Sequence, residues 1–323
     1  MNRIELKSST ERSVSFPAGR FIREIGRGVK GARSLSLSDA RELFQAILDG
    51  RVSDLELGAI LLSMRIKGES VDEIAGFLQA AETSFELLQA PAAAYMPVVI
   101  PSYNGSRRTA NLTPLLALLL AKAGAPVLVH GVLQDAGRVT SAEIFRELGV
   151  MPAESHEQVE QQLGQTLPVF VSIDVLAPRL SELLALRKIL GLRNSTHTLV
   201  KIVQPFAQAA LRLTSYTHPE YAEMLTQYFL SAADPERGAA FLMRGTEGET
   251  VASTKKVQQI DWFQHGRKAM LVEAQSGTDL NLAIPADAVG TAQWIRQVMD
   301  GAVPVPDNIA EQVRHILAAA KKQ

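Results

Sequence analysis

The chain has 323 residues, of which 46% are hydrophobic and 21% charged, and its formal net charge is −1. This composition predicts a folded protein, and the length accommodates a large domain with a smaller companion. The absence of cysteine excludes disulfides, thiolate metal sites and cysteine nucleophiles, and we expect a cytoplasmic protein. No N-terminal apolar core and no run of about eighteen apolar residues is found, so we expect neither a signal peptide nor a membrane span.

The N-terminal part of the sequence predicts a tail followed by helices. Residues 1–20 are rich in Ser, Arg and Glu without periodicity, which favours a flexible tail. The segment 61–82 predicts a helix, a turn at Gly68 and a further helix capped by Ser70. We therefore assign residues 21–94 to a small helical domain.

After residue 94 the helical period gives way to short apolar runs separated by helical stretches. The runs that predict buried strands lie at 96–101, 125–131, 168–173, 210–216 and 239–245. Strand, helix and strand in succession favour a parallel sheet. The predicted fold class is therefore α/β: a small all-helical N-terminal domain plus a large α/β domain, residues 95–323, with a mainly parallel central sheet. We expect helices around 178–203 to complete the helical domain and a closing helix at 309–322.

Five segments carry a family resemblance. They are MRIKGES at 64–70, PSYNGSRRTANLTP at 101–114, VHGVLQDAGRVTSAEIFRELGV at 129–150, LGLRNSTHTL at 190–199 and MRGTEGETVAS at 243–253. In this order they resemble the anthranilate phosphoribosyltransferase family, whose members have a helical domain beside a parallel α/β domain. The resemblance runs from about Phe21 to the C-terminus.

The segment 101–114 stands where the family has a glycine-rich turn, Gly-Thr-Gly-Gly-Asp, whose amides hold the diphosphate of phosphoribosyl pyrophosphate. Here Pro101, Tyr103 and Asn104 replace positions of that turn. Proline has no N–H and tyrosine obstructs a close approach, so we predict that the conventional diphosphate grip is lost. The degenerate substrate-loop positions are Ser102, Tyr103, Asn104, Gly105, Thr109, Asn111, Thr113, His130 and Gly131.

The segment 129–150 keeps the family's His130 and Gly131, while apolar residues replace its lysine, asparagine and arginine. His130 is interpreted either as a general base or as a structural hydrogen-bonding residue at a strand end. Arg138 occupies a family lysine position.

The segment 243–253 stands where the family has an adjacent acidic pair that holds magnesium on the diphosphate. Glu247 and Glu249 are separated by Gly248, so the adjacent pair is absent. We predict no catalytic residue, no metal and no cofactor, with Glu247 and Glu249 the candidates if a magnesium ion is bound.

These departures together resemble a paralogue group of the family, the YbiB-type proteins, and that resemblance implies a homodimer that binds nucleic acid and lacks transferase activity. The predicted phosphate-binding cations are Arg107, Arg108, Arg138, Arg193, Lys201 and Arg212, together with Arg23, Arg27, Lys30 and Arg33 in the basic run 20–33. Arg107 and Arg108 are alternatively a solvated loop, and Arg193 a helix-end salt bridge. Tyr103 is a candidate for stacking on a base.

We therefore predict sequence-independent binding of single-stranded DNA or RNA on a degenerate active site. The alternative is an active phosphoribosyltransferase that uses phosphoribosyl pyrophosphate, magnesium and an unknown acceptor. A third interpretation is a protein-interaction scaffold that keeps only the fold.

Overall fold

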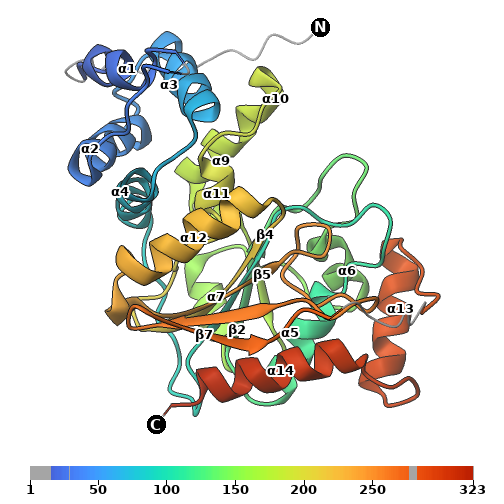
Figure 1. The fold of residues 1–323 in the computed structure, drawn as a ribbon. Coiled ribbons are helices and arrows are strands. Elements are labelled where there is room, and N and C mark those ends of the chain that lie inside the picture. Colours follow the sequence, from blue (N-terminus) through green and yellow to red (C-terminus); the bar gives the residue numbers. More distant parts are fainter. Residues whose placement is uncertain (1–15, 29, 276–281, 323) are drawn as a thin grey trace, which may run out of the picture.

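The computed structural model describes residues 16–28, 30–275 and 282–322. Its N-terminal layer consists of α1 (Gly19–Ile25), α2 (Leu37–Leu48), α3 (Asp54–Lys67) and α4 (Val71–Glu82) (Figure 1). Capping boxes at Ser53 and Ser70 begin α3 and α4, which confirms the predicted helix, turn and helix of 61–82. Helices α8 (Ile173–Leu176), α9 (Pro178–Ala185) and α11 (Thr196–Leu199) contribute to the same apolar core, and the short α10 (Arg187–Leu190) follows α9.

The start of the helical layer differs from the prediction. Phe16 is buried, its ring stacks on that of Phe21 at 5.5 Å between centroids, and its N–H donates to the carbonyl of Arg51. Residues 16–20 therefore pack against the helices where the sequence predicted a tail, because the spacing of two aromatic residues outweighs the polar composition around them. Residues 1–15 of the predicted tail lie outside the described residues.

One seven-stranded sheet has the order β3-β2-β1-β4-β5-β6-β7. Its strands are β1 (Val98–Ser102), β2 (Val127–Gly131), β3 (Val169–Ser172), β4 (Ala210–Tyr216), β5 (Gly238–Arg244), β6 (Ile260–Gln264) and β7 (Arg267–Val272). The first five are the predicted strands and run parallel, whereas β6 and β7 pair antiparallel. The antiparallel hairpin was not predicted. Its signal is His265-Gly266, a two-residue turn in which both residues have positive φ, 49° and 67°.

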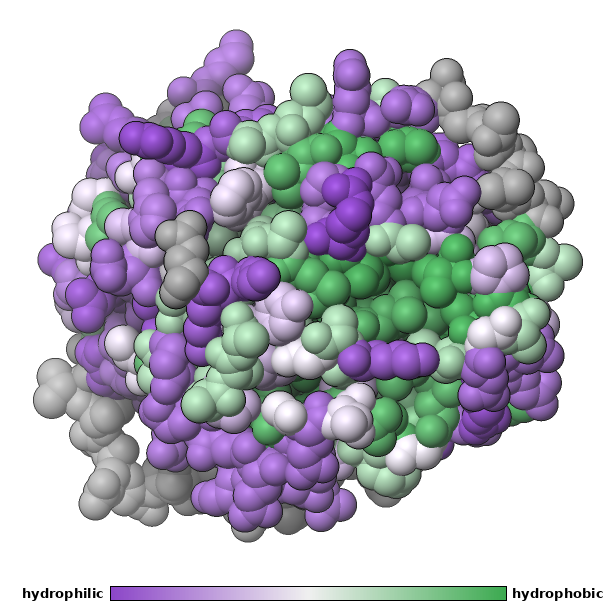
Figure 2. Space-filling model, turned by 90° about the horizontal axis from the view of Figure 1, so that it is seen from below, coloured by the Kyte–Doolittle hydropathy of each residue, from purple (hydrophilic) through white to green (hydrophobic). Residues whose placement is uncertain are grey.

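Helices cover both faces of the sheet (Figure 1). Helix α12 (Pro219–Ser231) lies on the face that shares its core with the helical layer. The core of the other face includes residues of α5 (Thr113–Lys122), α6 (Ser141–Glu147), α13 (Ala288–Met299) and α14 (Asp307–Ala320), while α7 (His156–Gln162) packs beside β3. Helix α14 confirms the predicted closing helix. Figure 2 views the molecule from below and shows an apolar area there, bordered by polar residues.

Segments that carry the family resemblance follow the parallel strands, so they lie together beyond the carboxyl ends of those strands. Ser102 of β1 lies beside Gly131 of β2, and Tyr216 of β4 lies beside Arg244 of β5. A Cβ at Gly131 would overlap the carbonyl of Ser102, so only glycine permits this close approach. Within the described residues, no helix is both long and apolar enough to cross a membrane.

Candidate functional site

The loop after β1 is closed by a carboxylate from the loop after β5. The backbone N–H groups of Asn104 and Gly105 donate to Oε1 of Glu249, at 2.9 and 2.7 Å. The Asn104 side chain donates to the carbonyl of Gly248 at 2.8 Å. Glu249 is fully buried, so its charge is held by amide dipoles rather than by water.

A second carboxylate holds the next three amides of the same loop. The N–H groups of Arg107, Arg108 and Thr109 donate to Glu247 at 2.8, 3.0 and 2.9 Å, and the Thr109 hydroxyl donates at 2.9 Å. Burial alone raises the pKa of Glu247, but these hydrogen bonds outweigh it and hold the pKa below the ordinary value. Successive amides that converge on one anion are the arrangement by which loops hold phosphates. Here two glutamates of the same chain occupy that position.

This arrangement does not fit a magnesium site. Three of the four carboxylate oxygens of Glu247 and Glu249 accept hydrogen bonds from the loop, and only the fourth, Glu249 Oε2, is buried without a partner. Magnesium prefers near-octahedral oxygen coordination with free carboxylates and waters. Among the described residues, no group of three or more His, Cys, Asp or Glu side chains is arranged to hold a metal.

The family-like polar residues of the β1 loop support the backbone. Ser102 Oγ and Asn111 Nδ2 both donate to Ser141 Oγ, at 2.7 and 3.0 Å. Asn111 Oδ1 accepts from the N–H of Thr113, the first residue of α5. These residues join the loop to the starts of α5 and α6, and all four are buried.

Tyr103 and His130 face each other inside the protein. The Tyr103 hydroxyl lies 2.7 Å from His130 Nδ1, and the rings meet edge to face. Burial lowers the pKa of His130 to about 3, so the imidazole is neutral at physiological pH and only weakly basic, which favours the structural interpretation of this residue. The half-buried Tyr103 ring packs against the helical core, and its stacking on a base stays a prediction.

A pocket of about 130 Å³ lies between the helical layer and the strand ends. Its lining includes Arg65 and Glu69 at the end of α3, Arg193 and Lys201 on either side of α11, and Tyr221 of α12. Arg193 donates to Asn104 Oδ1 at 3.0 Å, and Arg65 donates to the Tyr221 hydroxyl at 3.1 Å. Burial lowers the pKa of Lys201 to about 8, which leaves the amine mostly protonated at pH 7. The pocket therefore offers three cations to an anionic ligand.

The sequence alone did not indicate Arg65, His197 and Tyr221 as lining residues of this pocket. Arg65 stands in the segment MRIKGES and His197 in LGLRNSTHTL, both within the family resemblance, but neither was assigned to binding. Burial, followed by the charge of Arg193, lowers the pKa of His197 to about 4, so this histidine adds no positive charge near neutral pH. In the described part of the chain Arg193 forms no salt bridge, which contradicts the helix-end alternative.

The predicted cations lie in four different environments, of which the first is the pocket, lined by Arg193 and Lys201. Arg107 and Arg108 are exposed on the loop, and Arg138 donates to the carbonyl of Gly105 at 3.2 Å beside them. Arg212 is 3% exposed, donates to the carbonyl of Ile202 and lies over the ring of Phe229. The prediction that Arg212 contacts nucleic acid is therefore wrong, because β4 directs it into the core.

The basic run 20–33 is separate from this group. Arg23, Arg27, Lys30 and Arg33 are exposed in or after α1, which Figure 1 shows at the outer side of the helical layer. Arg27 is paired with Glu24 at 2.8 Å. The structure thus does not bring this run together with the cations at the strand ends.

Comparison with known proteins places the chain among relatives of matching length. A family model described as the helical bundle domain of a glycosyl transferase family matches residues 20–84. The uncharacterised protein YbiB of Escherichia coli (strain K12) is 43% identical over 303 residues, which cover 93% of each chain. The anthranilate phosphoribosyltransferase of Methylocella silvestris is 27% identical over 285 residues, 86% of this chain and 79% of the enzyme.

Solved structures agree on the fold. The anthranilate phosphoribosyltransferase of Thermus thermophilus superposes with a TM-score of 0.69 at 20% identity, covering 92% of this chain and 88% of the enzyme. The helical layer beside a mostly parallel α/β domain is therefore the predicted fold class, and it is confirmed.

Proposed function

The chain belongs to the anthranilate phosphoribosyltransferase-like family. We propose that it binds single-stranded nucleic acid without sequence preference and is not a transferase. The observation that carries the proposal is the occupation of the β1 loop by Glu247 and Glu249. Amides that are already bound to carboxylates are not free to hold a diphosphate, and two fixed negative charges repel one.

The same geometry turns the basic side chains of the loop outward. Arg107 and Arg108 are fixed through their backbone N–H groups, and both side chains are exposed. Within the described residues neither guanidinium forms an ion pair or a side-chain hydrogen bond. Unpaired arginines on a fixed loop are suited to phosphate contacts, because no internal bond has to be broken for binding.

A phosphate backbone requires several cations along a path. Arg138 lies beside the loop, and Arg65, Arg193 and Lys201 continue from it into the pocket below the helical layer. Tyr221 lines that pocket and is half-buried, which suits contact with an unpaired base.

The test is fluorescence anisotropy of a labelled single-stranded oligonucleotide over a salt series. With about five phosphate contacts and a slope of about −0.7 for each, log K is expected to fall by about 3 to 4 per tenfold increase in salt. Affinity that does not change with salt, or no binding at low salt, contradicts the proposal.

The transferase alternative is tested on the same preparation. We expect no heat of binding when phosphoribosyl pyrophosphate with magnesium is titrated in calorimetry, because both glutamates fill the amides that it requires. Saturable binding at millimolar ligand would favour the transferase.

We also propose that the protein is a homodimer. Exposed apolar side chains gather on α3, where Leu55, Leu62 and Ile66 are 85%, 46% and 59% exposed, and near α10, where Ile189 is 81% exposed. Such a group of exposed apolar residues marks an association surface. We expect Leu62→Glu with Ile66→Glu to convert a dimer into a monomer in light scattering, whereas Met151→Glu, an exposed apolar residue elsewhere, leaves the mass unchanged.

A further inference from the structure

A second cavity lies on the other side of the β1 loop. Its volume is about 230 Å³, and it is walled by the loops around Arg108 and Lys255 and by residues 282–284. On the opposite side, toward the pocket below the helical layer, the carbonyl of Gly248 is contacted by Ser215 Oγ, Lys201 Nζ and Asn104 Nδ2. The turn at 246–249 and the β1 loop thus separate this cavity from that pocket.

The lining has two chemically different parts. Leu112, Val251 and Ile284 form an apolar wall, whereas Arg108 and Lys255 are exposed cations that also line the cavity. No acidic residue is among the lining residues within the described chain. A ligand that fits both parts has an apolar face and a negative charge.

Hydroxyl groups between the two parts remain able to bond a ligand. Ser253 Oγ accepts from the N–H of Lys255 at 3.2 Å, so its own hydrogen is free to donate. Thr254 lines the cavity and is half-buried, and its hydroxyl has no partner within the described residues. Hydroxyls donate and accept equally well, so they tolerate any base edge.

We propose that this cavity binds one nucleotide unit, with the base against the apolar wall and the phosphate on Arg108 and Lys255. The inference rests on the proposed function, because the cavity would hold one nucleotide of a strand whose other phosphates lie along the cations. The volume is below the range of about 300 to 1,000 Å³ that is usual for drug-sized ligands, so one ring fits and a dinucleotide does not. Arg108 lines this cavity, and Asn104 of the same β1 loop accepts from Arg193 of the pocket below the helical layer, so one strand can reach from one to the other.

The inference is tested by calorimetry at low salt with three ligands. Uridine 5′-monophosphate is expected to bind with a dissociation constant below about 1 mM. Uridine, which lacks the phosphate, and ribose 5-phosphate, which lacks the base, are each expected to bind at least about tenfold more weakly, because each contacts only one part of the cavity. Equal binding of ribose 5-phosphate and uridine 5′-monophosphate overturns the assignment.

A matched pair of variants locates the ligand. Lys255→Ala is expected to weaken binding of uridine 5′-monophosphate about tenfold or more, since it removes a charge-assisted contact. Lys256→Ala removes the same charge from the next residue, which is exposed but does not line the cavity, and is expected to change binding less than twofold. Equal effects of the two variants overturn the inference.

The oligonucleotide titration on the same protein separates the two proposals. If the oligonucleotide binds but uridine 5′-monophosphate does not, the cavity assignment fails and the proposed function stands. If uridine 5′-monophosphate binds as expected but the oligonucleotide does not bind at any salt, nucleic-acid binding fails and the cavity remains a mononucleotide site.

Discussion

Arg107→Glu with Arg108→Glu is expected to weaken binding of a single-stranded oligonucleotide by about 100-fold or more at low salt. Two phosphate contacts are lost and two negative charges are placed on the path of the backbone. Loss of two contacts at about 0.7 each also reduces the slope of log K against log salt by about 1.4. Anisotropy over the salt series measures both quantities.

The fold is expected to tolerate this double variant. The loop is held through the backbone N–H groups of Arg107 and Arg108, which glutamate retains, and both side chains are exposed. The melting temperature is therefore expected to stay within about 2 °C of the parent, because exposed substitutions rarely exceed about 0.5 kcal/mol.

Lys321→Glu with Lys322→Glu is the matched control. These two exposed, adjacent lysines lie at the C-terminal end, which Figure 1 shows away from the strand ends, and their substitution changes the net charge equally. We expect a loss of less than about threefold, since charges beyond a Debye length of about 10 Å are screened. If both pairs weaken binding equally, the loss reflects net charge and the β1 loop is not the site.

The parallel half of the sheet was predictable because its strands are buried on both faces. Such strands appear in a sequence as unbroken apolar runs, and β1 and β2 are buried at every position. The hairpin β6–β7 was not predicted because β7 is an exposed edge strand that begins with Arg267 and Lys268, and its first four residues are exposed. Only its two-residue turn gave a local signal.

The site was predictable in part. Loss of the glycines at 101–104 indicated a changed loop, but nothing local indicated that Glu249, 145 residues beyond Asn104, would bind its amides. The pairing depends on β1, β4 and β5 lying side by side, so it follows from topology rather than from a motif. Arg212 was assigned wrongly for a related reason: the sequence around it does not show which face of the sheet its side chain lies on.

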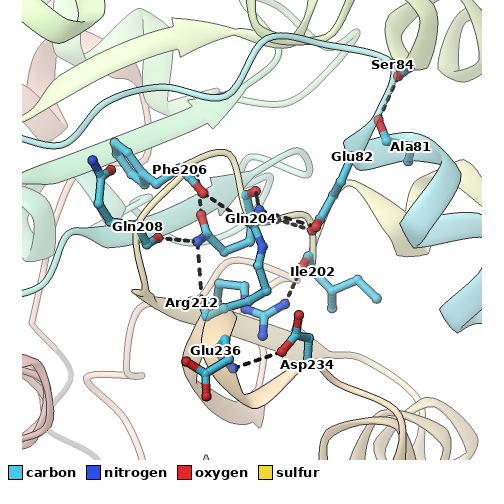
Figure 3. A network of polar contacts seen from close by, with 11 residues as sticks. Ala81, Glu82, Ser84, Ile202, Gln204, Phe206, Gln208, Arg212, Asp234 and Glu236 are labelled. Carbon is cyan, nitrogen blue, oxygen red and sulfur yellow. Dashed lines mark hydrogen bonds and ion pairs between the residues drawn. The ribbon is translucent and has the colours of Figure 1, made fainter.

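The helical layer is joined to the opposite end of the strands by a polar network that includes Glu82 and Gln204 (Figure 3). Glu82, the last residue of α4, accepts from the N–H of Gln204 at 2.8 Å and pairs with Arg237 at 3.3 Å. Arg237 also donates to the carbonyls of Gln204 and Phe206, at 2.7 and 2.8 Å. Burial raises the pKa of Glu82 although Arg212, Gln204 and Arg237 each lower it, so the ionised carboxylate depends on these partners.

Arg237→Met is expected to lower the free energy of unfolding by about 3 kcal/mol in urea denaturation at pH 7, because it removes the ion-pair partner of a mostly buried carboxylate and leaves only Arg212 to offset its burial. Adding Glu82→Gln is expected to restore part of this loss by removing the unpaired charge. Arg179→Met, in an exposed pair with Glu182, is the control and is expected to cost less than about 1 kcal/mol. An equal cost for Arg237→Met and Arg179→Met would refute the role of the network.

The loss in Arg237→Met is expected to depend on pH. A carboxyl group whose pKa is raised by folding destabilises the protein increasingly as the pH rises from the unfolded pKa through the folded one, so removal of Arg237 costs more at pH 8 than at pH 5. Binding of the oligonucleotide is expected to keep its salt slope, because Arg237 lies at the start of β5 and the phosphate-binding side chains lie beyond the ends of the strands. A variant that loses stability but keeps the slope would show that the cations on the β1 loop bind independently of the contacts that hold the helical layer to the sheet.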